Sequence, residues 1–219
     1  MQPEGVVSGA ATGPAQVAGV LFDLDGTLYA PPRLFKLRVA LACGGDLGML
    51  RHLSSVRHEL AGRSFASEAA LWDEHHALLA RRCGATVERA RRFYDQGFMP
   101  AFVEVLRRHA RPRPGLVELV RELAARGVVC CVLSDHGRVE QRLQALGLDA
   151  GLFHGCASSA ASGALKPAAR PFLQMAQRFQ VPPARWLVVG DRADTDGAGA
   201  AAAGMAFVGL GEPRAGRTG

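Results

Sequence analysis

The chain has 219 residues, of which 48% are hydrophobic and 21% are charged, and its formal net charge is +6. This balance is typical of a globular protein with one sizeable core and a smaller second unit. No apolar run reaches the roughly 18 residues that a membrane-spanning helix needs. Residues 1–16 carry Glu4 and lack the apolar segment of a signal peptide, so we expect a disordered leader, a cytoplasmic protein and no membrane partner.

The positive charge is scattered along the chain and forms no block. Arginine pairs such as Arg81-Arg82 lie within helical patterns and have few aromatic residues near them. Nucleic-acid-binding surfaces instead gather their basic residues on one face, so we predict no nucleic-acid partner. The five cysteines lack the paired spacing of zinc sites, and the neighbours Cys130 and Cys131 should point to opposite faces of a strand. We therefore expect free thiols.

The first predicted element is a short buried strand at residues 17–23, where an apolar run ends in charge. From residue 33 to residue 110 the apolar residues recur three or four apart, which predicts helices only. Ser67 and Thr86 suit helix N-caps, since each precedes a glutamate in the first turn. His75 and His76 are adjacent and so diverge around a helix, which indicates a polar helix face and not a metal site.

Strands and helices alternate after the break at residues 111–115. Strands are predicted at residues 128–134, 151–158, 186–191 and 206–210, with helical patterns between them. This alternation predicts an α/β fold: a Rossmann-like parallel sheet of five strands with helices on both faces, plus an inserted all-α domain. The domain assignment is a core at 17–32 and 111–210, a helical insertion at 33–110, a disordered leader at 1–16 and a flexible tail at 211–219.

Polar residues at the carboxyl ends of the strands are the first candidates for a site, because ligands bind there in such sheets. Asp23 and Asp25 come directly after the first strand, where two buried carboxylates are costly unless a cation neutralises them. Gly26 lets the chain turn sharply after them. An ordinary turn would explain one of these aspartates but not both.

The segment 23–28 (DLDGTL) resembles the first signature of the haloacid dehalogenase-like hydrolases, and three further signatures follow in the family's order. Ser134 ends the second strand in VLSD, and Lys166 precedes a helix in GALKP. VVGDRADTD contains Asp191 and Asp196 after the fourth strand. The resemblance covers residues 17–210, although the insertion, which stands where the family has a helical cap, matches only in position and helicity.

The resemblance implies phosphoryl transfer through an aspartyl-phosphate. Asp23 is implied as the nucleophile, and Asp25 as the acid that protonates the leaving group and the base that then activates water. Ser134, the backbone amide of Asp135 and Lys166 would bind the phosphate oxygens.

The resemblance also implies Mg²⁺ as the cofactor. Asp23, the main-chain carbonyl of Asp25 and Asp191 would bind the ion, and Asp196 would support them from behind. Asp194 falls off the family's spacing and has no predicted role.

Asp25 favours a phosphatase, because relatives that attack carbon–halogen bonds lack an acid two residues after the nucleophile. We predict a Mg²⁺-dependent phosphatase for a small phosphorylated metabolite, with a cap that excludes water and recognises the leaving group. A phosphomutase acting on a sugar phosphate and a catalytically inactive binding protein are the alternatives. Cap arginines could bind a second anionic group, although each fits a solvated helix face better: Arg33, Arg38, Arg57 and Arg63. Oligomeric state and physiological substrate are not indicated.

Overall fold

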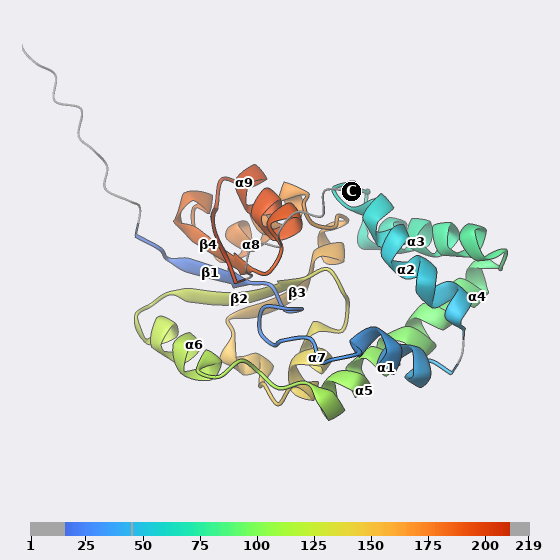
Figure 1. Cartoon of the computed structure of the whole chain (residues 1–219). Helices are drawn as coiled ribbons and strands as arrows, with labels where there is room; N and C mark the ends of the chain where they lie inside the picture. The colour runs from blue at the N-terminus through green and yellow to red at the C-terminus, as the bar shows by residue number, and fades with distance from the viewer. Residues whose placement is uncertain (1–15, 45, 211–219) are drawn as a thin grey trace, which may run out of the picture.

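A five-stranded parallel sheet forms the centre of the computed structural model, which describes residues 16–44 and 46–210 (Figure 1). Its strand order is β3 (Gly155–Ser158), β2 (Val129–Ser134), β1 (Gly19–Phe22), β4 (Trp186–Gly190) and β5 (Ala206–Gly209). Each strand falls within a stretch where the sequence predicted one, and the predicted fold class is confirmed. The predicted leader up to residue 15 and the predicted tail lie outside the described residues.

Helices cover both faces of the sheet (Figure 1). One face carries α6 (Leu116–Ala125) and α7 (Val139–Ala145), and the other carries α8 (Ala169–Arg178) and α9 (Ala198–Ala202). Side chains alternate along each strand, so Phe22 joins the core beneath α6 and α7 while Leu21 packs towards α8 and α9. Cys130 and Cys131 separate between the same two cores, and both are free thiols, as predicted.

Every element that the structure describes between β1 and α6 is helical. These helices are α1 (Phe35–Ala42), α2 (Leu47–Leu60), α3 (Glu68–Cys83), α4 (Val87–Arg92) and α5 (Met99–His109). The hydroxyls of Ser67 and Thr86 accept hydrogen bonds of 3.2 Å from the backbone N–H groups of Ala70 and Arg89. Both predicted N-caps are therefore confirmed.

A π-helical stretch, Phe93–Phe98, joins α4 to α5 into one continuous helical run. Pro100 lies in the first turn of α5 and has no N–H to donate to the preceding turn. A locally widened turn is a usual response where an ordinary helical hydrogen bond is interrupted. The sequence predicted the helices on both sides but not their junction.

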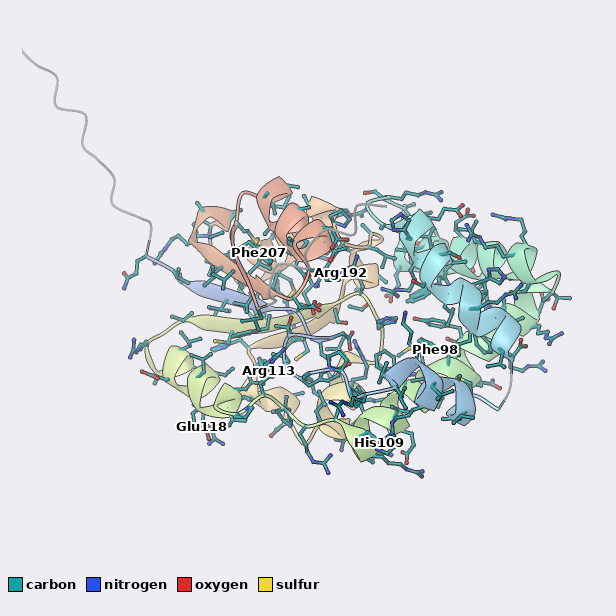
Figure 2. The ribbon with its side chains drawn as sticks, viewed as in Figure 1. Phe98, His109, Arg113, Glu118, Arg192 and Phe207 are labelled. Carbon is teal, nitrogen blue, oxygen red and sulfur yellow. The ribbon has the colours of Figure 1, made fainter. Side chains whose placement is uncertain are left out.

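The chain leaves the sheet for the helical insertion and returns from it at one place. Tyr29 and Pro112 form an antiparallel bridge there. The guanidinium of Arg113, labelled in Figure 2, donates to the carbonyls of Thr27 at 2.9 Å and Gly26 at 2.8 Å. The returning segment thus holds the loop that follows β1.

The insertion contacts the core again through the segment after α2. The backbone N–H of Phe65 donates to the carbonyl of Gly163 at 2.8 Å, and that of Gly62 donates to Leu165 at 3.4 Å. The Arg170 guanidinium donates to the Phe65 carbonyl at 2.8 Å. The insertion is therefore docked on the loop that leads to Lys166.

His75 and His76 are buried in the insertion, with 0% and 4% of their surface exposed, so the prediction of a polar helix face was wrong. His75 lies four residues after Leu71 and three before Leu78, on the apolar face of α3. Its ring packs against Trp72 and Tyr94, with centroids 5.2 and 4.8 Å away.

Among the described residues we find no helix capable of spanning a bilayer.

Candidate active site

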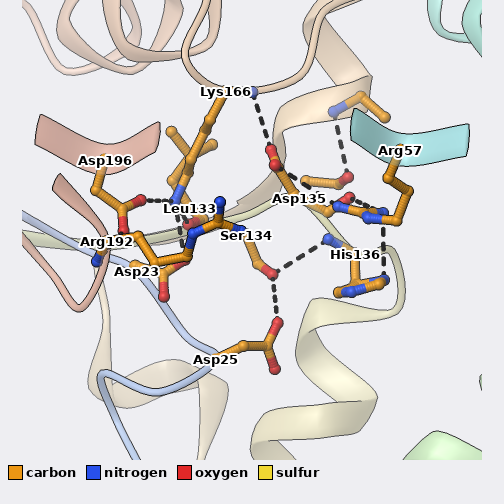
Figure 3. Close-up of polar contacts among 12 residues, drawn as sticks. Asp23, Asp25, Arg57, Leu133, Ser134, Asp135, His136, Lys166, Arg192 and Asp196 are labelled. Carbon is orange, nitrogen blue, oxygen red and sulfur yellow. Dashed lines mark hydrogen bonds and ion pairs between the residues drawn. The ribbon is translucent and has the colours of Figure 1, made fainter. Parts of the chain in front are cut away.

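The predicted site residues meet at the carboxyl ends of three neighbouring strands. Asp23 follows β1, Ser134 ends β2 and Asp191 follows β4, and the sheet order β2-β1-β4 places these ends side by side. Lys166 reaches the same point from the loop before α8, and Asp196 from the π-helical turn Ala193–Gly197 that precedes α9 (Figure 3). The structure thus brings together side chains separated by up to 173 residues of sequence.

Asp23, Lys166 and Asp196 form a buried charged cluster (Figure 3). The Lys166 ammonium lies 2.8 Å from Asp23 Oδ1, 2.8 Å from Asp196 Oδ1 and 2.8 Å from the Leu133 carbonyl. Burial raises the pKa of Asp23 to about 7, against the lowering effect of Lys166. The pKa of Lys166 lies above its ordinary value, because the charges of Asp23 and Asp196 outweigh the opposing effect of burial. The lysine therefore remains an ammonium ion.

The carboxylates of Asp23, Asp191 and Asp196 suit a divalent cation. One oxygen of each lies within 4.8 Å of the others, and among the described residues no other group of acidic, histidine or cysteine side chains meets this criterion. Carboxylate oxygens are preferred ligands of Mg²⁺. Two of the three carboxylates, those of Asp23 and Asp196, are buried, where a cation would offset the cost of their negative charge.

Gly26 makes room for one of these carboxylates. A Cβ atom at this position would lie 2.3 Å from Asp191 Oδ2 and 2.6 Å from its Cγ. The backbone φ of Gly26 is also +91°, in the region that glycine favours. Both conditions explain why a glycine follows the two aspartates.

Asp25 is held by three donors from three parts of the fold. Tyr29 donates to its Oδ1 at 2.8 Å, while the Arg142 guanidinium at 2.6 Å and the Ser134 hydroxyl at 3.2 Å donate to its Oδ2. Burial acts to raise the pKa of Asp25, but the charge and hydrogen bond of Arg142 outweigh it and lower the pKa to about 2. Asp25 is thus a carboxylate beside Ser134.

Asp135 directs its side chain away from Asp23. Its Oδ1 accepts a hydrogen bond from the backbone N–H of Lys166 at 3.1 Å, and its Oδ2 lies 3.6 Å from the guanidinium of Arg57 on α2. Arg57 also donates to the Asp135 carbonyl at 3.2 Å and contacts His136 Nδ1 at 3.3 Å (Figure 3). The carboxylate thus orders the loops, which leaves the backbone amide of Asp135 as the group predicted to bind phosphate.

Asp194 lies apart from the carboxylate cluster. Its carboxylate pairs with the guanidinium of Arg192 at 2.6 Å, and 70% of its side chain is exposed. Asp196, two residues later, is 98% buried with only 2% of its surface exposed, and its Oδ2 accepts from the backbone N–H of Arg192 at 3.3 Å. The π-helical turn therefore sends one aspartate inwards and the other to the surface.

Of two arginines near the site, the sequence analysis considered one, Arg57, and overlooked the other, Arg142. Arg57 is one of the four cap arginines considered above, and it alone of the four reaches Asp135; Arg38 instead donates to His109, and Arg63 lies near Glu74. Sequence reasoning missed Arg142 altogether.

The signal for Arg142 lay in the helical periodicity. It stands three residues after Val139 and one before Leu143, on the buried face of α7. An arginine at such a position needs a buried acidic partner.

The sequence matches the haloacid dehalogenase-like hydrolase family over residues 17–204. Among similar proteins, the glyceraldehyde 3-phosphate phosphatase of Methanopyrus kandleri is 28% identical over 205 residues, which cover 88% of this chain and 83% of the relative.

Solved structures of similar fold include a predicted phosphoglycolate phosphatase from Haemophilus somnus, with a TM-score of 0.60, 24% identity and coverage of 90% of this chain and 86% of that one. CbbY from Rhodobacter sphaeroides in complex with phosphate has a TM-score of 0.63 and 19% identity, with coverage of 90% of this chain and 87% of that one. A 2-haloacid dehalogenase from Pseudomonas syringae has a TM-score of 0.61 and 22% identity, with coverage of 93% of this chain and 91% of that one. With its core matched from β1 to α9, this chain belongs to the haloacid dehalogenase-like hydrolase family.

Proposed function

We propose that the protein is a Mg²⁺-dependent phosphatase that hydrolyses a small phosphate monoester through an aspartyl-phosphate on Asp23. The observation that carries this proposal is the arrangement around Asp23: Lys166 at 2.8 Å on one side, and Asp25 beside Ser134 on the other. A nucleophile, a cation for phosphate oxygens and an acid–base group are the components that phosphoryl transfer to a carboxylate requires.

The first step forms a bond between Asp23 and phosphorus and breaks the bond to the leaving oxygen. Asp25 is ionised in the free site, and the negative charge of a phosphate bound beside it favours uptake of a proton from solvent. Asp25 then gives this proton to the leaving oxygen, so the product is an alcohol and not an alkoxide. In the second step Asp25 takes a proton from water as the water oxygen attacks phosphorus and Asp23 departs. Asp25 ends the cycle protonated, and inorganic phosphate carries the remaining proton of the water.

Ser134, the backbone amide of Asp135 and Lys166 are proposed to bind the phosphate oxygens in both steps. Lys166 suits this role because its ammonium group is already held at 2.8 Å from Asp23. Asp23, Asp191 and the main-chain carbonyl of Asp25 would hold Mg²⁺, with Asp196 supporting the ligands. When bound, the ion would offset the negative charge that otherwise opposes attack by a carboxylate on a phosphate.

The fold does not distinguish a phosphatase from a dehalogenase, since structures of both kinds resemble this chain. Asp25 supports the phosphatase, because an alkoxide leaving group needs a proton and a halide does not. A phosphomutase would use the same residues but return the phosphoryl group to a sugar. An inactive binding protein is less well supported, because every predicted catalytic position is occupied.

The enclosure of the site supports a small substrate. Ser134, Lys166 and Asp196 have at most 3% of their surface exposed, and the insertion contacts the core both at Asp135 and at Gly163. The similar Methanopyrus protein is a glyceraldehyde 3-phosphate phosphatase, and CbbY has been seen with xylulose 1,5-bisphosphate. We propose a phosphorylated metabolite of that size, and no nucleic-acid partner. Cytoplasmic location remains a prediction.

Phosphate release from a panel of phosphorylated metabolites tests the function directly. We expect turnover that chelation of divalent cations abolishes and Mg²⁺ restores. Product analysis by phosphorus NMR separates the alternatives: free phosphate indicates a phosphatase, and an isomeric sugar phosphate indicates a mutase. A well-folded protein that binds such compounds without converting them would overturn both enzymatic proposals.

Replacing the nucleophile tests the covalent step. Asp23→Asn removes the attacking charge, so turnover should fall by at least ~10⁴-fold. Mass spectrometry of acid-quenched wild-type enzyme should find phosphate on the peptide that contains Asp23, and Asp23→Asn should lack it. Asp194→Asn, at an exposed aspartate, is the matched control and should retain both the phosphopeptide and activity. Substantial turnover by folded Asp23→Asn would contradict the mechanism.

A further inference from the structure

Arg142 is a buried cation that belongs to none of the four signatures. Its side chain on α7 has no exposed surface. Its guanidinium donates to Asp25 Oδ2 at 2.6 Å, Ser134 Oγ at 2.7 Å, and the carbonyls of His136 and Gly137 at 2.8 and 3.1 Å. The ring of Phe102 on α5 covers it from the insertion, with its centroid 5.3 Å away. A rigid fork thus joins the two site residues to the loop between β2 and α7.

Both oxygens of the Asp25 carboxylate are engaged by this surrounding. Tyr29, which is 1% exposed, donates to Oδ1, and Arg142 and Ser134 donate to Oδ2. Rotation of the carboxylate would break hydrogen bonds on both sides, one of them a charge-assisted bond to a fully buried group. The position of Asp25 is therefore set by Tyr29 and Arg142 together.

Arg142 also orients the hydroxyl of Ser134. That oxygen accepts from Arg142 at 2.7 Å and from the backbone N–H of His136 at 3.3 Å. With its acceptor positions engaged, its single proton is left to donate, to Asp25 at 3.2 Å in this structure (Figure 3) or to a phosphate oxygen when one is bound. One guanidinium thus aligns the acid–base group with a group that binds phosphate.

We propose that Arg142 is a positioning residue for proton transfer to the leaving group, an inference that rests on the proposed phosphatase activity. It holds Asp25 at a fixed place relative to the phosphate bound at Ser134.

A purely structural role is the competing explanation, in which Arg142 only compensates the charge of Asp25 within the fold. Loss of such a partner would lower every activity to the same extent. Loss of positioning would instead depend on how much the leaving group needs a proton. The two explanations therefore differ in leaving-group dependence.

Arg142→Met should be tested in the first turnover with two esters. p-Nitrophenyl phosphate releases an anion that is stable without protonation. The best alkyl phosphate of the metabolite panel releases an alkoxide, which must be protonated. We expect release of the alcohol to slow by ~10²–10³-fold and release of p-nitrophenolate by ~10-fold or less. Arg142→Lys, which keeps the charge but cannot reach both partners, should fall between wild type and Arg142→Met. Arg107→Met, at an exposed arginine, should match wild type with both esters.

Two further variants keep the test decisive if Arg142→Met folds poorly. In Asp25→Asn/Arg142→Met both charges of the pair are removed, and the alcohol should be released as slowly as from Asp25→Asn alone, because Arg142 acts through Asp25. Tyr29→Phe removes the other hydrogen bond to Asp25 without changing shape, and should give the same leaving-group dependence at about 3–10-fold.

The results separate this proposal from the function on which it rests. Equal losses with both esters, wild-type rates in Arg142→Met, or a further large loss when Arg142→Met is added to Asp25→Asn would overturn the positioning role alone. A wild-type protein that hydrolyses neither ester would overturn the proposed function, and the role of Arg142 with it.

Discussion

The three aspartates that follow β4 have different surroundings. Asp191 lies against Gly26 at the carboxylate cluster, Asp196 is buried against Lys166, and Asp194 pairs with Arg192 at the surface. Of these three, Asp191 is the one that we predict to contact the metal directly. Asp196, whose Oδ1 is 2.8 Å from the Lys166 ammonium, is expected to orient the ligands.

We predict a graded loss of Mg²⁺ affinity in alanine variants of these residues. Asp191→Ala should bind Mg²⁺ most weakly, and Asp194→Ala should bind it as wild type does. The Mg²⁺ affinity of Asp196→Ala should fall by about 10–100-fold, as is common when a group that supports the metal ligands is removed. Titration calorimetry with Mg²⁺ measures this without depending on turnover. Impaired binding in Asp194→Ala beside normal binding in Asp196→Ala would mean that the two residues have been assigned the wrong way round.

At the scale of elements, α3 contains the buried imidazole of His75. Neither of its ring nitrogens has a hydrogen-bond partner, and both are enclosed by the rings of Trp72 and Tyr94. Burial, followed by the nearby charges of His76 and Arg57, lowers the pKa of His75 to about 3 from 6.5. The folded protein therefore keeps His75 neutral at a pH where the unfolded chain binds a proton.

Folding stability should consequently fall as the pH drops below the unfolded pKa of His75. The stability that neutral His75 allows is fully present above pH 6.5 and is lost as the pH falls towards about 3. Between about pH 7 and pH 5 the free energy of unfolding should fall by about 2 kcal/mol because of this residue. Urea unfolding of His75→Phe should show a smaller pH dependence than wild type, because phenylalanine does not titrate. His58→Phe, on an exposed position of α2, is the control and should keep the wild-type slope. An unchanged slope in His75→Phe would show that His75 is not the source.

Elements explain which parts of the site could be predicted. Asp23, Ser134 and Asp191 could be predicted from the sequence, because parallel strands end at one edge of a sheet. Residues that directly follow such strands therefore lie close to one another. Arg142 and His75 stand on apolar helix faces, but a single polar residue in such a face cannot be told from an exposed one until its surroundings in the fold are known. Arg57 on α2 could not be separated from Arg63, which follows α2, because how the insertion docks decides which side chains of this stretch meet the core.

Over the whole molecule, the insertion divides into a near and a far part. α1 and α5 pack together through Phe35 and Phe102, and α5 lies on α7, where Phe102 covers Arg142. The far part, α2 to α4, contacts the site through Arg57 and the loop before Lys166 through Phe65. Gly97 lies near the carbonyl of Cys43, so the two ends of the far part are neighbours.

Removal of the far part should separate chemistry from substrate selection. With residues 44–96 replaced by a short Gly-Ser linker, we expect a folded protein that hydrolyses p-nitrophenyl phosphate weakly and no longer ranks natural substrates. Replacing residues 33–110 also strips α5 from α7, so that variant should have a lower melting temperature. Melting curves and the metabolite panel measure both effects. A variant lacking 44–96 that kept the full substrate ranking would show that selectivity lies elsewhere.

The missing side chain at Gly26 has a consequence for heredity. Any single-base missense change in a glycine codon introduces a residue with a Cβ atom, and here that atom would fall 2.3 Å from the Asp191 carboxylate. The φ of +91° adds backbone strain for the same substitutions. Such an allele would displace Asp191 while leaving both nearby aspartates, Asp23 and Asp25, in the sequence. A gene that retains every acidic residue of the site can therefore still have lost it, through the smallest residue in the motif.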